Sequence, residues 1–330
     1  MRRRLLVWIG LVLAVMGLVA AVVVEFGGLR PKRVHRIGFL ANAASPTVFS
    51  EGFRQGLAEL GYVEGESVVV EWRYAEISEA RLAELADELV RLQPDVLVCA
   101  GTQACLALKR ATETIPIVMG NSSDPVGAGL VTSLGRPGGN VTGVSAIGPQ
   151  LAQKRLALLR DLHPTMQRVA VIWNPADPPR RTEFREVESA AKQLNLDVLS
   201  LPVGTVAQLQ TAIGQAKAWP ADALVVLEDP LTHSHIGSFV PLIVQAGLPS
   251  AHSTAPYARA GGLMSYGADL AQVYRRSATY VDKILKGAKP ADLPVEQADQ
   301  FELVVNQDTA RALGMTIPQS VLAEVTHLIP

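Results

Sequence analysis

The feature that most constrains the fold is an internal repeat with an offset of about 130 residues. Strand-like segments alternate with amphipathic helix-like segments twice along the chain, in the same order. The matching pairs are RIGFLANAAS at 36–45 with RVAVIWNPAD at 168–177, QPDVLVCAGT at 93–102 with PADALVVLED at 220–229, and TIPIVMGNSS at 114–123 with AGLPSAHSTA at 246–255. Strand–helix alternation predicts doubly wound parallel sheets, and its repetition predicts two similar α/β lobes.

Length and composition agree with this prediction. A chain of 330 residues has room for two lobes, each with its own core. Apolar residues make up 48% and charged residues 18% of the sequence, as in a globular protein. The formal net charge of −1 provides no long-range field for holding nucleic acid, so we expect no nucleic-acid partner.

The N-terminus predicts export. Arg2, Arg3 and Arg4 precede Leu5–Val24, a run of twenty residues without charge or proline, which is long enough to cross a bilayer. We expect residues 1–30 to be a signal peptide, cut after Val19-Ala20-Ala21, or an uncleaved membrane anchor. In both cases the rest of the chain lies outside the cytoplasm.

The sequence contains two cysteines, Cys99 and Cys105. Two are too few for a disulfide framework, although the predicted compartment is oxidising. Cys99 ends a strand-like run and Cys105 lies on the following helix. We interpret them as two small buried residues rather than as a bridge or a metal pair.

Polar loops follow the predicted strands of both lobes. In an open parallel sheet, ligands bind beyond the carboxyl ends of the strands, beside helix N-termini. The loops rich in Asn, Ser, Thr and Asp are 42–47, 101–103 and 121–125 in the first lobe, and 174–177, 229–232 and 252–254 in the second. Any one of these residues could simply cap a helix, so the prediction rests on their convergence. It is a cleft for a small polar or zwitterionic ligand.

Motifs for nucleotide binding or nucleophilic catalysis are incomplete. Gly127 and Gly129 would require a third glycine where Thr132 stands, and the sequence contains no GK[ST]. Ser145 lies in GVSAI, where a nucleophile elbow needs glycine in place of Ile147. We therefore expect no cofactor and no enzymatic activity.

Metal binding is also not indicated. His233 and His235 are two residues apart and would diverge on a helix, and no third ligand has suitable spacing. We expect no metal site.

Several longer segments resemble one known family. ELGYVEGESVVVEWRYAE, ATETIPIVMGNSSDPVGAGLVTSLGRPGGNVTG, RVAVIWNPADP and GGLMSYGADLAQVYRRSATYVDKILKGAKPADLPVEQ are similar to segments of ABC-transporter substrate-binding proteins of the tryptophan/tyrosine type. The similarity extends over about Arg33 to Pro318. It implies the type I periplasmic binding-protein fold, in which two lobes close around one small molecule. It also implies two partners, an inner-membrane permease and its ATPase.

The resemblance implies three crossings between the lobes. We place the first near Asn140–Val144, with Gly138, Gly139 and Gly143 as hinge residues. The second is placed near Ala260–Met264, with Gly261 and Gly262, because glycine absorbs changes of φ and ψ. The third precedes FELVVN. The predicted lobes are 33–142 plus 263–290, and 143–262 plus 295–330.

The resemblance also implies ligand-binding residues, by position in the motifs. These are Asn42, Ser45, Thr102, Ser122, Ser123, Asp124, Ser145, Asn174, Asp229 and Tyr266. Thr102, Ser122 and Ser123 are expected to hold a carboxylate, and Tyr266 to stack on an apolar group. Asp124 or Asp229 would pair with an ammonium, although Asp124-Pro125 could instead form a turn.

One position departs from the family. Members often carry a proline and alanines after the Gly-Thr pair, whereas this chain has Gln103-Ala104-Cys105. Gln103 adds a donor and an acceptor at the edge of the cleft, which allows a ligand other than those in the family name.

The predicted function is an extracytoplasmic solute receptor for ABC import that binds an amino-acid-like or aromatic carboxylate ligand. The alternatives are a membrane-tethered sensing domain without a transporter, a cleft enzyme, and the effector module of a transcription regulator. An enzyme would need a complete catalytic motif, and a regulator would need a helix-turn-helix where Leu5–Val24 stands.

Overall fold

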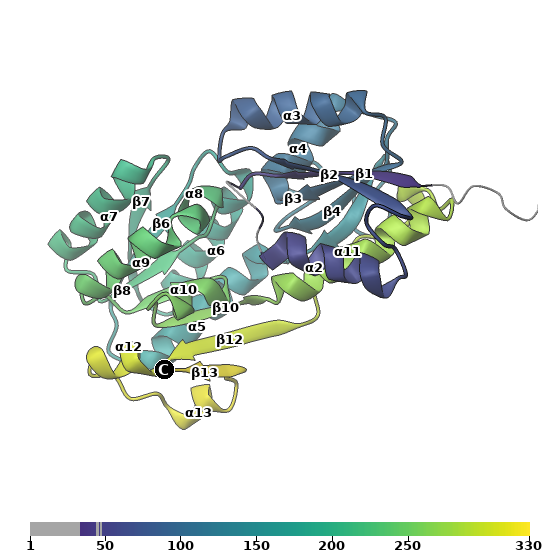
Figure 1. Cartoon of the computed structure of the whole chain (residues 1–330). Helices are drawn as coiled ribbons and strands as arrows, with labels where there is room; N and C mark the ends of the chain where they lie inside the picture. The colour runs from purple at the N-terminus through teal and green to yellow at the C-terminus, as the bar shows by residue number, and fades with distance from the viewer. Residues whose placement is uncertain (1–33, 44–45, 47) are drawn as a thin grey trace, which may run out of the picture.

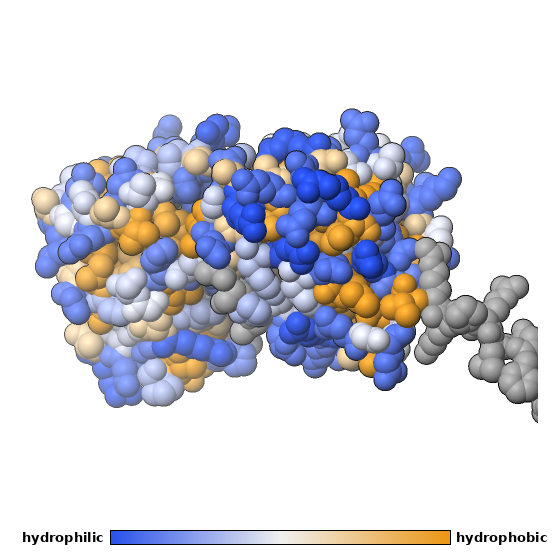
Figure 2. Space-filling view, turned by 45° about the horizontal axis from the view of Figure 1, so that its top comes forward, coloured by the Kyte–Doolittle hydropathy of each residue, from blue (hydrophilic) through white to orange (hydrophobic). Residues whose placement is uncertain are grey.

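The computed structural model describes residues 34–43, 46 and 48–330, so the predicted segment Leu5–Val24 and the predicted site residue Ser45 lie outside the described residues. The described chain forms two lobes, each built on one mainly parallel β-sheet with helices on both faces (Figure 1). The lobes lie side by side and contact each other (Figure 2). This arrangement is the predicted α/β architecture.

The first lobe contains a sheet with the strand order β11-β5-β4-β3-β1-β2. All neighbouring strands in it are parallel. Its strands are β1 (His35–Ala41), β2 (Val68–Tyr74), β3 (Val96–Ala100), β4 (Ile117–Ser122), β5 (Val141–Ser145) and β11 (Glu296–Gln297).

Four helices cover the two faces of the first sheet. Helices α2 (Val48–Glu59) and α11 (Leu270–Leu285) pack against each other on one face. Helices α3 (Glu79–Arg91) and α4 (Thr102–Ala111) cover the other face. The sequence encodes α3 clearly, because Ser78 accepts a hydrogen bond from the Arg81 N–H at its start and a leucine stripe is buried along it.

The second lobe contains a sheet with the order β13-β12-β10-β9-β8-β6-β7. Its strands are β6 (Arg168–Trp173), β7 (Asp197–Pro202), β8 (Ala223–Val226), β9 (Ser250–His252), β10 (Met264–Ala268), β12 (Phe301–Asn306) and β13 (His327–Ile329). Strand β12 runs antiparallel to β10, and the other pairs are parallel.

Helices again cover both faces. Helices α5 (Gly148–Leu162) and α6 (Pro178–Gln193) pack on one face, and α7 (Val206–Ala218) and α9 (Ile236–Gln245) on the other. The short helices are α8 (Pro230–Ser234), α10 (Ala255–Arg259), α12 (Gln307–Ala312) and α13 (Gln319–Leu322), with a 3₁₀ turn at Pro290–Asp292.

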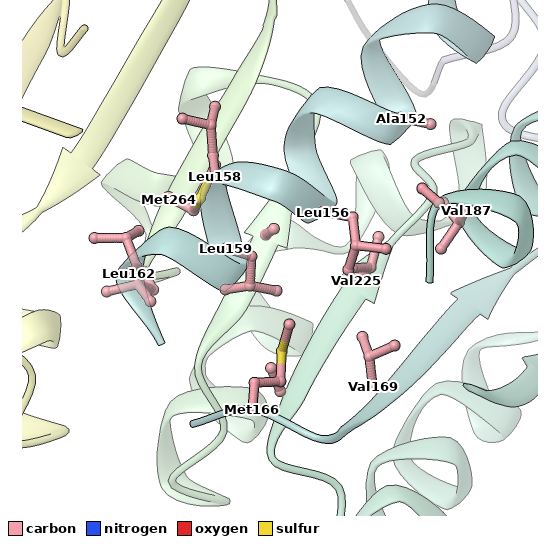
Figure 3. Close-up of a cluster of buried hydrophobic side chains, with 14 of the residues drawn as sticks. Ala152, Leu156, Leu158, Leu159, Leu162, Met166, Val169, Val187, Val225 and Met264 are labelled. Atoms are coloured by element: carbon pink, nitrogen blue, oxygen red, sulfur yellow. The ribbon is translucent and has the colours of Figure 1, made fainter. Parts of the chain in front are cut away.

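The core of the second lobe shows how packing fixes α5. Leu156, Leu159 and Leu162 of α5 are almost fully buried against Val225 and Met264 of the sheet (Figure 3). Burying one leucine side chain contributes about 1.5–3 kcal/mol. These leucines fix the C-terminal part of α5 against the sheet. The N-terminal end of α5 lies where the chain enters the second lobe.

The chain crosses between the lobes three times. The first crossing lies between β5 and α5, the second between β10 and α11, and the third between β11 and β12, because the members of each pair belong to different lobes. The chain therefore stays in the first sheet as far as Ser145 before the first crossing. It stays in the second sheet as far as Ala268 before the second crossing. Both points lie beyond the predicted boundaries at 142 and 263.

The glycines proposed as hinge residues have other surroundings. Gly143 lies inside β5, and a Cβ there would stand 2.3 Å from the Met119 carbonyl oxygen, so glycine permits close strand packing. Gly138 and Gly139 lie before β5, within the first lobe. Gly261 and Gly262 lie between α10 and β10, within the second lobe. The predicted positions of the first two crossings were wrong, because glycine serves packing and turns here.

The prediction for the cysteines was also wrong. Cys99 ends β3, Cys105 lies one turn into α4, and their sulfurs form a disulfide with the Cα atoms 5.0 Å apart. The tight turn from strand to helix brings the two side chains together. Six residues of separation gave no sign of this in the sequence.

Candidate ligand-binding site

A cavity of about 190 Å³ lies between the lobes, at the carboxyl ends of strands from both sheets. Its walls come from the loops that follow β1, β3 and β4 in the first lobe, and from α5, α6 and the loops after β8 and β9 in the second. This is the position expected for a ligand in open parallel sheets. Its polar lining residues are Asn42, Thr102, Gln103, Asn121, Ser122, Ser123, Arg155, Asp177, Arg180, Glu183, Glu228, Asp229, His233, Ser234, Ser253, Thr254 and Tyr274.

The first-lobe wall carries no charged side chain among the described lining residues. Gly101 (φ 89°) precedes α4 and gives it no side-chain cap, and the residues at this helix start, Gly101, Thr102 and Gln103, line the cavity. Thr102 Oγ1 and Ser122 Oγ are 3.1 Å apart and share a hydrogen bond. The Asn42 side-chain amide donates to Gln103 Oε1 at 2.6 Å. This wall offers hydroxyls, amides and a helix N-terminus.

The second-lobe wall is charged, and Arg180 lies at its centre. The Arg180 guanidinium donates to Asp177 Oδ2 at 3.1 Å and to Glu183 Oε2 at 2.9 Å. All three residues are at most 7% exposed. Asp177 precedes α6 and the other two lie on its first turns, so one helix start positions the group. Burial raises the pKa of Asp177 to about 6, against the opposing effect of Arg180.

Arg155 and Glu228 form a second charged group. Arg155, on α5, donates to Ser253 Oγ at 2.7 Å and has Glu183 Oε2 at 3.9 Å. Glu228 accepts from the backbone N–H groups of Ser253 and Thr254 and from the Thr254 hydroxyl. Burial nevertheless raises the pKa of Glu228 to about 7. Burial lowers the pKa of Arg155, although Glu183 and Glu228 oppose that shift.

Asp229 follows Glu228 and starts α8. Its Oδ1 accepts from the Thr232 N–H at 2.9 Å, and its Oδ2 accepts from the Asn174 side-chain amide at 2.6 Å. Asn174 does not line the cavity but holds a carboxylate that does. The carboxylate is therefore fixed in position at the cavity wall.

Ser123 joins the two lobes beside the cavity. Its hydroxyl accepts from Arg180 Nη2 at 2.7 Å, and its carbonyl oxygen accepts from the Gly148 N–H at 3.0 Å. Gly148 starts α5, and a Cβ there would lie 2.2 Å from Glu183 Oε1 and 2.8 Å from Ser123 Cβ. Only glycine allows the three elements to approach this closely.

Six of the sequence-predicted residues line the cavity: Asn42, Thr102, Gln103, Ser122, Ser123 and Asp229. Three others are placed elsewhere. Asp124 Oδ1 accepts from the Gly127 N–H at 2.8 Å and stabilises a turn, which was the alternative considered for it. Ser145 Oγ accepts from the Ile147 N–H at the first crossing, and Tyr266 packs against the second-lobe core.

Four charged lining residues were missed. Arg155, Arg180, Glu183 and Glu228 were not predicted, whereas Asp177, Ser253 and Thr254 fall within the predicted strand-end loops. Asp177, Arg180 and Glu183 recur every three residues directly after a strand-end loop, so one helix face carries all three. That spacing was the available signal.

The described part of the chain contains neither a membrane-spanning helix nor a metal-binding cluster. No helix within 34–43 and 48–330 is long and apolar enough to cross a membrane. No group of three or more His, Cys, Asp or Glu residues in that part is arranged to hold a metal ion.

Known proteins similar to this chain share its architecture. A domain from Streptococcus pneumoniae, solved in complex with L-Trp, has a TM-score of 0.85 and 30% identity, and covers 90% of this chain and 100% of its own. A conserved domain protein from Vibrio cholerae has a TM-score of 0.85 and 31% identity, with the same coverage. A tyrosine-binding protein of Clostridioides difficile (strain R20291) is 28% identical over 265 residues, which are 80% of this chain and 76% of that protein.

The family match extends over nearly all of the described chain. Residues 41–329 match the family described as ABC transporter substrate binding protein. Together with the two solved structures, this match confirms the predicted family and its type I periplasmic binding-protein fold. The protein belongs to the ABC transporter substrate-binding protein family.

Proposed function

We propose that this protein is the extracytoplasmic receptor of an ABC importer and that it binds an amino-acid-like or aromatic carboxylate solute between its lobes. The observation that carries the proposal is the chemical difference between the cavity walls. The second lobe presents buried carboxylates, and the first presents hydroxyls and an uncapped helix N-terminus. A ligand with an ammonium at one end and a carboxylate at the other fits this arrangement.

The first-lobe wall suits the carboxylate. The N–H groups at the start of α4 and the hydroxyls of Thr102 and Ser122 are donors beside a positive helix end. The second-lobe wall suits the ammonium. Asp229 is fixed by Asn174 and Thr232, and Asp177 keeps one oxygen, Oδ1, without a hydrogen-bond partner.

The similar proteins support an amino-acid-like ligand. One was solved with L-Trp and another is named for binding tyrosine. Both molecules carry the ammonium and carboxylate that the two walls would hold. The side chain of the ligand would lie among the apolar lining residues Ala41, Ala100, Ala146, Leu151 and Leu270.

Binding would favour the closed arrangement of the lobes. A ligand that contacts both walls stabilises closure by the difference between its affinities for the closed and the open form. The Ser123–Arg180 hydrogen bond adds a direct contact between the lobes in that form. The permease would recognise the closed receptor and receive the solute, and the predicted segment Leu5–Val24 would direct or tether the receptor outside the cytoplasm.

A thermal-shift screen of the full-length protein in mild detergent tests the proposal. The panel contains the amino acids and aromatic carboxylates, with sugars as the control class. A solute at a hundredfold excess over its Kd stabilises the folded protein by about 2.7 kcal/mol, which gives a clear rise of the melting temperature. Calorimetry then confirms one site per chain.

Import is tested with the solute that the screen identifies. Cells that lack this protein are expected to lose uptake of that solute and to regain it when the protein is restored. Stabilisation by sugars alone, or chemical turnover of the bound solute, would contradict the proposal.

A further inference from the structure

The charges that line the cavity do not balance. The second lobe contributes the carboxylates of Asp177, Glu183, Glu228 and Asp229, but only the guanidinium groups of Arg155 and Arg180. With all six ionised, four negative charges face two positive ones. Each of these residues is at most 8% exposed.

No other charged group compensates for this excess among the described lining residues. The first-lobe wall and α11 contribute amides, hydroxyls and Tyr274. His233 of α8 is the remaining titratable neighbour, and burial lowers its pKa, so it is neutral at neutral pH. Buried charges in proteins are normally paired, so an unbalanced cluster around a cavity indicates that the partner is the ligand.

Two carboxylate oxygens without hydrogen-bond partners support the same conclusion. Asp177 Oδ1 and Glu183 Oε1 are buried without a hydrogen-bond partner, and both are the oxygens not used by Arg180. Asp177 is 4% and Glu183 is 0% exposed. A buried carboxylate oxygen without a donor is costly, and a cationic nitrogen in the cavity would satisfy it.

We propose that the ligand carries a net positive charge, as a basic amino acid does, and that Asp177 holds one of its cationic nitrogens. This inference rests on the proposed function and narrows its ligand class. A zwitterion with a neutral side chain adds no net charge and leaves the two excess carboxylates uncompensated. A second ammonium or a guanidinium on the ligand side chain adds one net positive charge and compensates for one of the two.

Four probes separate the contributions of charge in calorimetric titrations of the full-length protein. L-Lysine carries the extra cation, L-norleucine is its neutral counterpart, cadaverine lacks the carboxylate, and L-tryptophan represents the aromatic amino acids. We expect lysine to bind at least about tenfold more tightly than norleucine, because one hydrogen bond to a charged group in a buried site changes affinity by about that factor or more. Cadaverine distinguishes a diamine ligand from a basic amino acid.

The variant Asp177→Asn tests the assigned residue, and Asp124→Asn is the matched control because Asp124 stabilises a turn away from the cavity. Asp177→Asn is expected to lower lysine affinity at least about tenfold more than it lowers norleucine affinity. Asp124→Asn is expected to change neither.

A measurement on the unaltered protein covers the case in which Asp177→Asn does not fold. The raised pKa values of Asp177, about 6, and of Glu228, about 7, mean that both are partly protonated near pH 6.5. A bound cation stabilises their ionised forms, so lysine binding is expected to release protons. Titrations in two buffers of different ionisation enthalpy measure this release.

Three outcomes would overturn the inference. They are norleucine or tryptophan binding as tightly as lysine, proton uptake or no proton exchange on lysine binding, and no binding by lysine or cadaverine. Tryptophan binding without lysine binding would leave the proposed function standing. Failure of every solute in the wider screen would remove both.

Discussion

Ser123 connects the lobes through both its main chain and its side chain. Its hydroxyl accepts from Arg180 Nη2 of the other lobe, while Arg180 keeps its pairs with Asp177 and Glu183 in the second lobe. The contact exists only when the lobes are close together, so it contributes to closure and not to the stability of either lobe alone. The residue therefore links ligand binding to lobe position.

Substitution of Ser123→Ala is expected to weaken ligand binding about tenfold and to leave the melting temperature of the ligand-free protein nearly unchanged. The loss follows from removing the acceptor of a buried charged donor, which costs about 1–3 kcal/mol in the closed form. Calorimetry measures the affinity and small-angle X-ray scattering measures lobe closure. Ser238→Ala is the control, because Ser238 is exposed on α9, does not line the cavity, and donates its hydroxyl to the His235 carbonyl oxygen. Equal affinities for both variants would rule out the closing role.

At the scale of elements, the start of α5 is where the first crossing enters the second lobe. Ile147 there has left-handed φ and ψ angles of 47° and 42°, and Gly148 follows it in contact range of Ser123 and Glu183. The variant Gly148→Ala would place a methyl group between the two lobes. We expect it to reduce ligand affinity about tenfold or more, because overpacking of this kind costs about 1–3 kcal/mol.

Scattering curves and calorimetry test this expectation for Gly148→Ala. Its scattering curve is expected to remain that of an open form when ligand is added. Gly135→Ala is the matched control, since Gly135 is exposed and a Cβ there would meet no atom within 4 Å. Normal closure of Gly148→Ala would mean that the elements can move apart without affecting the site.

The disulfide fixes a second element boundary, between β3 and α4. It encloses Ala100, Gly101, Thr102 and Gln103, all of which line the cavity. Closing so short a loop stabilises a protein by about 2–3 kcal/mol in the chain-entropy account. Reduction is therefore expected to lower the melting temperature by several degrees and to weaken ligand binding.

The double variant Cys99→Ala, Cys105→Ala provides the control for the disulfide. It is expected to melt at the temperature of the reduced protein, and a reducing agent should not shift it further. A reducing agent that lowers the melting of this variant as much as that of the unaltered protein would show that the disulfide is not the cause.

The helices, strands and loops also show how much of the fold and of the cavity could be predicted from the sequence. The repeat predicted both sheets, because buried parallel strands require apolar runs such as VLVCA and ALVV, and amphipathic helices separate them. The strand-end loops were predicted because topology alone places Thr102, Ser122 and Asp229 at one edge. Arg155 and Arg180 were not, since their position at the cavity depends on how α5 and α6 rotate about their axes. Gly143 was misassigned because local sequence does not show that Met119 packs against it.

At the scale of the whole molecule, the ionisable groups of the cavity are confined to the second lobe. Arg155, Asp177, Arg180, Glu183, Glu228 and Asp229 all come from elements of that lobe. Burial in the cavity wall raises the pKa of Asp177 and of Glu228. The dependence of stability on pH reports on this burial.

The pKa of Glu228 predicts the direction of that dependence. Burial raises it from 4.5 to about 7, so the folded state holds a proton that the unfolded state has released between these values. The stabilising contribution is complete below about pH 4.5 and is lost as the pH rises through about 7. The shift corresponds to about 3 kcal/mol of stability.

Denaturant unfolding of the ligand-free protein at a series of pH values, compared with that of Glu228→Gln, isolates the contribution of this group. Glutamine retains an acceptor for the Ser253 and Thr254 N–H groups and does not titrate. The variant should therefore gain stability relative to the unaltered protein as the pH rises from 4.5 to 8, and a constant difference over that range would show that Glu228 is ionised throughout.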